Sequence, residues 1–287
     1  MDLLVRRLDG LHDAEGAFVG LYGNSSHAFW LDSSGGVGER ARFSFIGAAD
    51  GPLGAFVSYD VDAGEVRVER GGEVETFRES IFDYLGRETR RLRRPAAGLP
   101  FDVDCGFVGY FGYELKADCD GDAAHAAPTS DATLLFADRL VAFDHLERRT
   151  YLHCLTEPDG ADAAWRWIEE TSRRLASLPP LSDPEPAVPS DDERVDFHLS
   201  RSRERYLEDI ATCKRRLFEG DTYEVCLTNR VTVEAAPDSL DIYRALRRVN
   251  PAPFASFLRL GEVAVLSSSP ERFLRVGPDR WAEARPI

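Results

Sequence analysis

Apolar residues recur at helical spacing in several segments of the chain. The clearest segment begins at Ser202, a residue type that caps helices, and ends before Gly220. Large side chains lie three or four positions apart on one face of it: Tyr206, Ile210, Cys213 and Leu217. The same spacing predicts three further helices, over residues 80–93, 161–178 and 239–249.

Short runs of apolar and β-branched residues between turn residues predict strands. In the first third of the chain they form a β-meander over residues 28–31, 42–46, 54–59, 66–70 and 74–77. Further along, residues 134–143 and 150–155 predict a hairpin, and residues 222–233 predict one long strand. A second hairpin is predicted for residues 254–266, because glycine in Gly261-Glu262 occupies the first central position of a tight turn.

A carboxylate follows this second hairpin. Pro270 has no backbone N–H to give to a strand ladder, so pairing should stop there and leave Glu271 on a bend. A glutamate in this position is usually exposed to solvent. If apolar walls enclosed it, its pKa would rise to about 6 to 7, where the acid can deliver a proton to a leaving hydroxyl.

A proline-rich acidic stretch divides the chain. Pro179, Pro180, Pro184, Pro186 and Pro189 stand among Asp, Glu and Ser with few large apolar residues. This composition is typical of a linker or a long surface crossing. We therefore expect a β-rich domain with covering helices over residues 1–178, a linker over 179–196, and a second domain over 197–287.

Composition and charge exclude several classes of protein. The net charge of -15, from 50 acidic and 35 basic residues, repels polyphosphate and argues against a nucleic-acid partner. No run approaches the roughly 18 apolar residues of a membrane span, and the start of the chain does not resemble a secretion signal, so we expect a cytoplasmic protein. The 5 cysteines include no Cys-x-x-Cys pair, which predicts free thiols.

Residues 106–115, GFVGYFGYEL, interleave glycines with aromatic residues. The spacing of Gly106, Gly109 and Gly112 differs from that of a dinucleotide-binding loop, and the strand-then-helix context is absent. A glycine-bent core strand and a functional segment both remain open as interpretations.

Several motifs, in this order and spacing, resemble the chorismate-utilising enzymes. They are GDTYEVCLTN at 220–229, YRALRRVNPAPF at 243–254, SSPE at 268–271 and ARPI at 284–287. Upstream, FWLDSS at 29–34, RARFSFIG at 40–47 and residues 106–115 resemble the N-terminal domain of the same group, so that the resemblance covers nearly the whole chain. Residues 223–229, YEVCLTN, are more similar to component I of aminodeoxychorismate synthases than to component I of anthranilate synthases.

This resemblance implies an α+β fold in which two orthogonally packed antiparallel β-sheets, with strands from both halves of the chain, are wrapped by helices. Residues 197–287 would then begin a chorismate-binding catalytic domain. The implied reaction is magnesium-dependent replacement of the chorismate 4-hydroxyl by an amino group, on the way to 4-aminobenzoate and folate. A glutamine amidotransferase would supply the ammonia. The alternatives are anthranilate synthase component I and a non-catalytic module that holds tryptophan or docks the amidotransferase.

The resemblance also implies functional roles for individual residues. Glu271 matches the general acid of the family's Ser-Pro-Glu motif. Eight residues match the family's tryptophan pocket, or alternatively only close the core between the sheets: Ser33, Arg40, Ala41, Arg42, Phe43, Pro253, Phe254 and Ala255.

The match ends early. The family continues after Arg-Pro-Ile with Lys-Gly-Thr in aminodeoxychorismate synthases or Ala-Gly-Thr in anthranilate synthases, and this sequence stops at Ile287. The proposed lysine nucleophile would be the next residue. We therefore expect that the C-terminal part is missing, that this segment contains no magnesium ligands, and that it is inactive alone.

Overall fold

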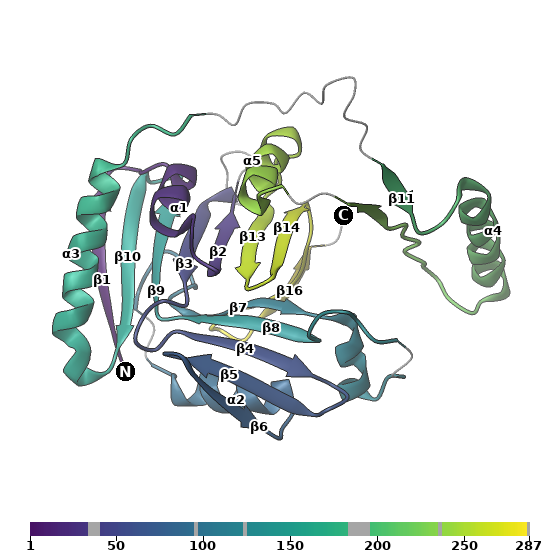
Figure 1. Ribbon diagram of the computed structural model, residues 1–287, viewed down its shortest axis with the longest axis horizontal. Helices are drawn as coiled ribbons and strands as arrows, with labels where there is room; N and C mark the ends of the chain where they lie inside the picture. The colour runs from purple at the N-terminus through teal and green to yellow at the C-terminus, as the bar shows by residue number, and fades with distance from the viewer. Residues whose placement is uncertain (34–40, 95–96, 123–124, 183–195, 235–236, 286–287) are drawn as a thin grey trace. The chain divides into compact units, whose positions relative to one another are not determined.

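The computed structural model describes residues 1–33, 41–94, 97–122, 125–182, 196–234 and 237–285 (Figure 1). The chain divides into two compact units, one of Met1–Pro184 with Ser239–Ile287 and the other of Glu185–Asp238. This division differs from the expected boundaries at 178/179 and 196/197, because the last strands of the chain pair with the first unit. Most of the expected linker, residues 183–195, lies outside the described residues.

The larger unit contains a seven-stranded sheet in which every neighbouring pair is antiparallel. Its spatial order is β1 (Asp2–Asp9), β10 (Arg149–Thr156), β9 (Arg139–Asp144), β3 (Phe43–Ala48), β2 (His27–Asp32), β13 (Phe254–Leu260) and β14 (Val263–Ser269). Because β13 pairs with β2, the two ends of the sequence contribute to one sheet, as expected.

A five-stranded antiparallel sheet completes the core of this unit. Its order is β6 (Glu73–Phe77), β5 (Glu65–Arg70), β4 (Ala55–Asp60), β8 (Ala132–Ala137) and β7 (Gly106–Phe111). Figure 1 shows its strands running across those of the larger sheet. Side chains of both sheets meet in one apolar cluster, which includes Phe29 and Phe45 from the larger sheet and Leu135 from the smaller.

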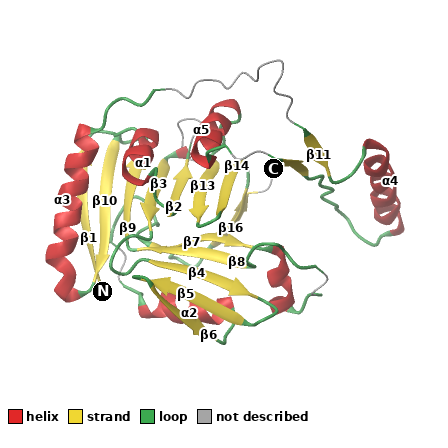
Figure 2. Ribbon diagram, viewed as in Figure 1, coloured by secondary structure: helices red, strands yellow, loops and turns green. Residues whose placement is uncertain are grey.

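Helices cover the outer faces of the two sheets (Figure 2). Three of them, α1 (Ala14–Tyr22), α3 (Ala161–Ser177) and α5 (Ser239–Val249), share a core with the seven-stranded sheet. Helix α2 (Ile81–Arg91) packs on the five-stranded sheet through Ile81 and Tyr84. The connections that the structure describes include the 3-10 segments η2 (Tyr113–Cys119) and η3 (Pro158–Gly160). The α+β architecture with two antiparallel sheets and covering helices is therefore confirmed.

The same unit ends in a separate two-stranded ribbon, β15 (Arg272–Val276) and β16 (Ala282–Arg285). This ribbon directly follows Glu271 and was not expected from the sequence.

The smaller unit consists of β11 (Phe197–Leu199), α4 (Arg203–Glu219) and β12 (Val231–Val233). Helix α4 forms as expected, since the Ser202 side chain accepts a hydrogen bond from the Arg205 N–H and Gly220 closes the helix with φ 81°. The long strand expected over 222–233 is wrong. Only its last three residues form a strand ladder, with β11. Thr228, Asn229 and Arg230 instead exchange isolated hydrogen bonds with Ser200 and Arg201.

Other expectations need correction. The run 134–143 is not one strand, because it breaks at the buried Asp138 and continues from β8 in one sheet to β9 in the other. Strand β1 and helix α1 were missed; α1 is short and largely buried, so it lacks a two-sided pattern despite its Asp13 cap. Residues 106–111 form the glycine-containing strand β7, which is one of the two open interpretations.

Candidate functional site

Glu271 lies on the bend that the sequence predicts. Strand β14 ends at Ser269, and Pro270 and Glu271 form no ladder. The Ser269 hydroxyl donates to the Glu271 carbonyl at 2.9 Å and accepts from the Glu271 N–H at 3.3 Å. The glutamate is exposed, so the described residues do not enclose it.

Two contacts fix the chain on either side of this bend. The Ser268 hydroxyl donates a hydrogen bond to the carbonyl of Asn250, at the end of α5. Beyond the bend, the Arg272 guanidinium lies 5.4 Å from the centroid of the Phe254 ring. The bend carrying Glu271 is therefore anchored to the segment between α5 and β13.

The first group of residues matched to the tryptophan pocket lies at the end of β2 and the start of β3. The Ser33 hydroxyl donates to the Phe43 carbonyl at 2.6 Å, and the Ser33 N–H donates to Ser44 Oγ at 3.1 Å. Ala41 is buried. Arg40 lies outside the described residues.

The second group, Pro253, Phe254 and Ala255, lies at the same end of the sheet. Ala255 pairs with Asp32 on one side and with Ser268 on the other. Strand register therefore brings both groups matched to the tryptophan pocket together, and places the second group between Ser33 and the Ser-Pro-Glu bend.

Arg42 is already engaged by a protein carboxylate. Its Nε and Nη2 donate to the two oxygens of Asp144 at 3.0 and 2.7 Å, and the Asp144 side chain is fully buried. Burial raises the pKa of Asp144, but the hydrogen bonds from Arg42 and from backbone N–H groups outweigh it, and the net shift is downward. This geometry favours the interpretation in which Arg42 closes the core.

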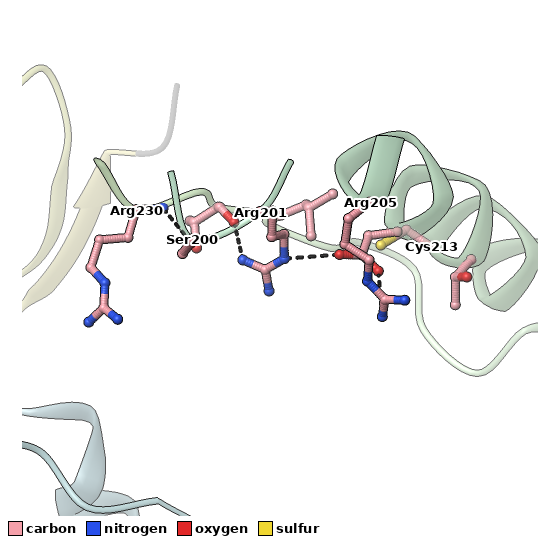
Figure 3. Close-up of a pocket in the computed structure, with 9 residues that line it drawn as sticks. Ser200, Arg201, Arg205, Cys213 and Arg230 are labelled. Carbon is pink, nitrogen blue, oxygen red and sulfur yellow. Dashed lines mark hydrogen bonds and ion pairs between the residues drawn. The ribbon is translucent and has the colours of Figure 1, made fainter. Parts of the chain in front are cut away.

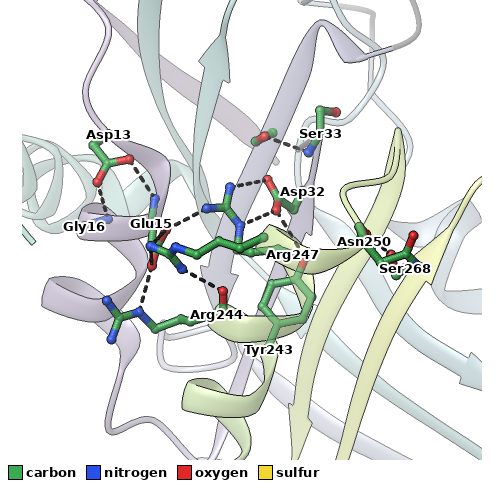
Figure 4. A network of polar contacts seen from close by, with 12 residues as sticks. Asp13, Glu15, Gly16, Asp32, Ser33, Tyr243, Arg244, Arg247, Asn250 and Ser268 are labelled. Carbon is green, nitrogen blue, oxygen red and sulfur yellow. Dashed lines mark hydrogen bonds and ion pairs between the residues drawn. The ribbon is translucent and has the colours of Figure 1, made fainter. Parts of the chain in front are cut away.

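Next to these groups, a buried ionic network joins α5 to α1 and β2 (Figure 4). Arg244 Nε donates to Glu15 at 2.7 Å, and Arg247 donates to both Glu15 and Asp32, at 2.6 and 2.8 Å. Tyr243 donates to Asp32 at 3.3 Å. The side chains of Glu15 and Asp32 are 6% and 3% exposed.

Electrostatics keep Glu15 ionised in this network. Burial raises its pKa, whereas hydrogen bonds from Arg244 and Arg248 and the charge of Arg247 lower it, and the net shift is downward. Sequence reasoning missed this network. One signal was available: Arg244, Arg247 and Arg248 share a helix face at spacings of three and four, and a face of that kind needs carboxylate partners when buried.

The smaller unit carries an open, arginine-lined pocket with a volume of about 750 Å³ (Figure 3). Arg201 and Arg205 both pair with Asp209, at 2.9 and 3.1 Å, while Arg230 is exposed at the other end of the lining. Three arginines line this pocket against one carboxylate, so its net charge is positive and favours an anion. Sequence analysis did not identify it.

The described residues gather no group of three or more His, Cys, Asp or Glu side chains that could hold a metal ion. Within the same described ranges, no helix is long and apolar enough to cross a membrane.

Comparison with known proteins settles the family. Residues 26–287 match the chorismate binding enzyme family. The chain belongs to this family. It is 45% identical, over 99% of its length, to an aminodeoxychorismate synthase of Streptomyces pristinaespiralis, and covers 40% of that protein. The corresponding enzyme of Streptomyces griseus is 43% identical, with 99% of this chain and 39% of that protein covered. The chain therefore spans well under half of these relatives.

Anthranilate synthases are less similar to this member of the family. Anthranilate synthase component 1 from Geobacillus stearothermophilus is 28% identical to this chain. The match covers 90% of this chain and 53% of that protein. Among solved structures, anthranilate synthase component I from Streptococcus pneumoniae TIGR4 aligns with a TM-score of 0.60 at 18% identity, covering 83% of this chain and 52% of that one. This structural likeness supports the fold.

Proposed function

We propose that the protein acts as component I of an aminodeoxychorismate synthase and replaces the 4-hydroxyl of chorismate with an amino group. The observation that carries this proposal is the difference in similarity, 45% identity to an aminodeoxychorismate synthase against 28% to an anthranilate synthase. The YEVCLTN wording of residues 223–229 supports the same choice.

Glu271 is the proposed general acid toward the departing hydroxyl. Its position on an anchored bend, rather than within a strand, supports this role, because a bend can present a side chain to a ligand. A carboxyl must have a raised pKa to hold its proton near neutrality. Since Glu271 is exposed in the described structure, the proposal requires that substrate or further parts of the protein enclose it.

The sources of ammonia and magnesium, a tryptophan ligand and the cellular location are further parts of the same proposal. Ammonia comes from a glutamine amidotransferase subunit or domain, and magnesium is held by residues other than those described here. Tryptophan is a second proposed ligand, supported by the register that gathers Ser33, Phe43 and Phe254 at one end of the sheet. The free cysteines are in keeping with a cytoplasmic location.

The full-length enzyme, supplied with chorismate, magnesium and ammonia, tests the proposal. We expect 4-amino-4-deoxychorismate as product, and formation of anthranilate instead would overturn the assignment. Glu271→Gln should lower kcat by about 100-fold or more, because general acid catalysis contributes on that order. The matched control is Glu262→Gln, an exposed glutamate at the other end of β14, which should leave kcat unchanged.

A further inference from the structure

Arg272 directly follows Glu271 and begins the ribbon of β15 and β16. Its side chain is 25% exposed, whereas the two large apolar residues that follow it are more exposed, Phe273 at 87% and Leu274 at 52%. The opposite order is usual, because charged side chains are among those least often buried. Specific partners must therefore hold the Arg272 side chain against the protein.

Two such partners contact the Arg272 guanidinium. It lies over the Phe254 ring, 5.4 Å from the ring centroid, and its Nη2 lies 2.9 Å from a carboxylate oxygen of Glu283. Phe254 begins β13 of the seven-stranded sheet, and Glu283 lies on β16 of the ribbon. The cation-π contact and the ion pair attract the guanidinium from two elements, and together they restrict where it can lie.

The ribbon is tethered a second time, three residues further along β15. Arg275 pairs with Asp102, in the segment that leads into β7, and its guanidinium lies 4.0 Å from the Glu283 carboxylate. The ladder between β15 and β16 is irregular between Arg272 and Arg275. Side-chain contacts therefore supplement the backbone pairing at this end of the ribbon, next to the bend.

We propose that Arg272 is a positioning residue for the general acid Glu271. By holding Phe254 and Glu283, its guanidinium fixes the backbone that follows the bend, and so aims the acid at the departing hydroxyl. Ser268 constrains the chain before the bend, and Arg272 constrains it after the bend. This inference rests on the proposed function, in which Glu271 delivers the proton.

A double-mutant cycle in the full-length enzyme tests the proposal. Arg272→Met keeps an unbranched apolar stem but removes the charge, and should lower kcat by about 10- to 100-fold with KM changed less than about twofold, because a misplacement of about 1 Å can cost that much. In the Glu271→Gln background the same substitution should change kcat by less than about twofold, since a residue that acts only through Glu271 then has no acid to position. A residue that only stabilised the fold would lower kcat in both backgrounds.

Two further variants complete the experiment. Arg272→Lys keeps a positive charge near Phe254 and Glu283, so it should retain more activity than Arg272→Met. The same cycle is run with Arg272→Lys, which keeps the experiment decisive if Arg272→Met does not fold. The matched control is Arg280→Gln, at an exposed arginine in the connection between β15 and β16, and it should leave kcat unchanged.

The outcomes separate this inference from the proposed function. Equal losses of kcat in the two backgrounds, or an unchanged kcat in the Arg272 variants, would overturn the inference and leave the role of Glu271 intact. An unchanged kcat in Glu271→Gln alone would overturn the proposed role of Glu271, and with it the positioning role of Arg272.

Discussion

Arg247 and Asp32 are 215 positions apart in the chain, yet Arg247 Nε donates a 2.8 Å hydrogen bond to Oδ2 of Asp32. Asp32 is the last residue of β2 and immediately precedes Ser33, while Arg247 belongs to the last turn of α5. The pair therefore ties the helix that leads into Pro253 and Phe254 to the strand that leads into Ser33. It fixes the distance between the two groups matched to the tryptophan pocket.

Removal of this contact should destabilise the protein strongly. Arg247→Gln leaves the buried Asp32 carboxylate without its guanidinium partner, and losses of this kind cost about 3–5 kcal/mol. The control Arg67→Gln breaks an exposed pair with Glu69 and should cost under about 1 kcal/mol. Urea unfolding of both variants measures the difference; similar losses in both would show that the network contributes little.

The local sequence pattern predicted those elements whose ends or turns are marked by specific residue types. Helix α4 has a serine cap and a closing glycine, and the hairpin of β13 and β14 has Gly261 with φ 68° at its turn. The bend at Pro270 was predictable for the same reason, because proline cannot continue a ladder.

Features that depend on distant partners were not predictable. Residues 222–230 have the composition of a strand but form no strand ladder in the described structure, so composition alone misled. The network of Glu15, Asp32 and the α5 arginines joins segments more than 200 positions apart, and no local pattern shows which arginine is buried. Glu271 as a candidate acid came from resemblance, since its exposure gives no chemical signal.

Two glycine-to-alanine variants should distinguish a glycine that close backbone packing requires from one that only adds flexibility to the chain. A Cβ on Gly109 would lie 2.0 Å from the Thr133 carbonyl oxygen, and a backbone atom cannot move aside easily. Gly109→Ala should therefore destabilise by about 1–3 kcal/mol or more. In helix α2, a Cβ on Gly86 would meet only the flexible end of Arg90, at 3.6 Å, so Gly86→Ala should stabilise by about 0.5–1 kcal/mol. Thermal denaturation of the two variants should give shifts of opposite sign.

Tryptophan binding is testable by calorimetric titration of the full-length enzyme. If Phe254 contributes to the proposed pocket, Phe254→Ala should weaken tryptophan binding by about tenfold, because contact with one aromatic ring is worth about 0.5–1.5 kcal/mol beyond its buried area. Phe273→Ala removes an equal side chain that is 87% exposed on β15, and should leave the affinity unchanged. Absence of binding heat in the unaltered enzyme would remove the basis of the tryptophan proposal.

His153 should make stability depend on pH. Its ring is fully buried, stacks on Phe101 with centroids 5.2 Å apart, and neither ring nitrogen has a hydrogen-bond partner among the described residues. Burial, and secondarily the charge of Arg94, lower its pKa from 6.5 to about 3. Between these values the unfolded chain binds a proton that the folded protein does not.

The free energy of unfolding contributed by this group is therefore complete above pH 6.5 and falls as the pH drops toward 3, by up to about 1.4 kcal/mol per pH unit. Urea unfolding at a series of pH values from 7 to 4.5 measures the slope. His153→Phe keeps a ring against Phe101 and should flatten the slope by that amount, whereas His198→Gln, at an exposed position, should leave it unchanged. Equal slopes in the His153 variant and the unaltered chain would show that His153 becomes protonated without unfolding.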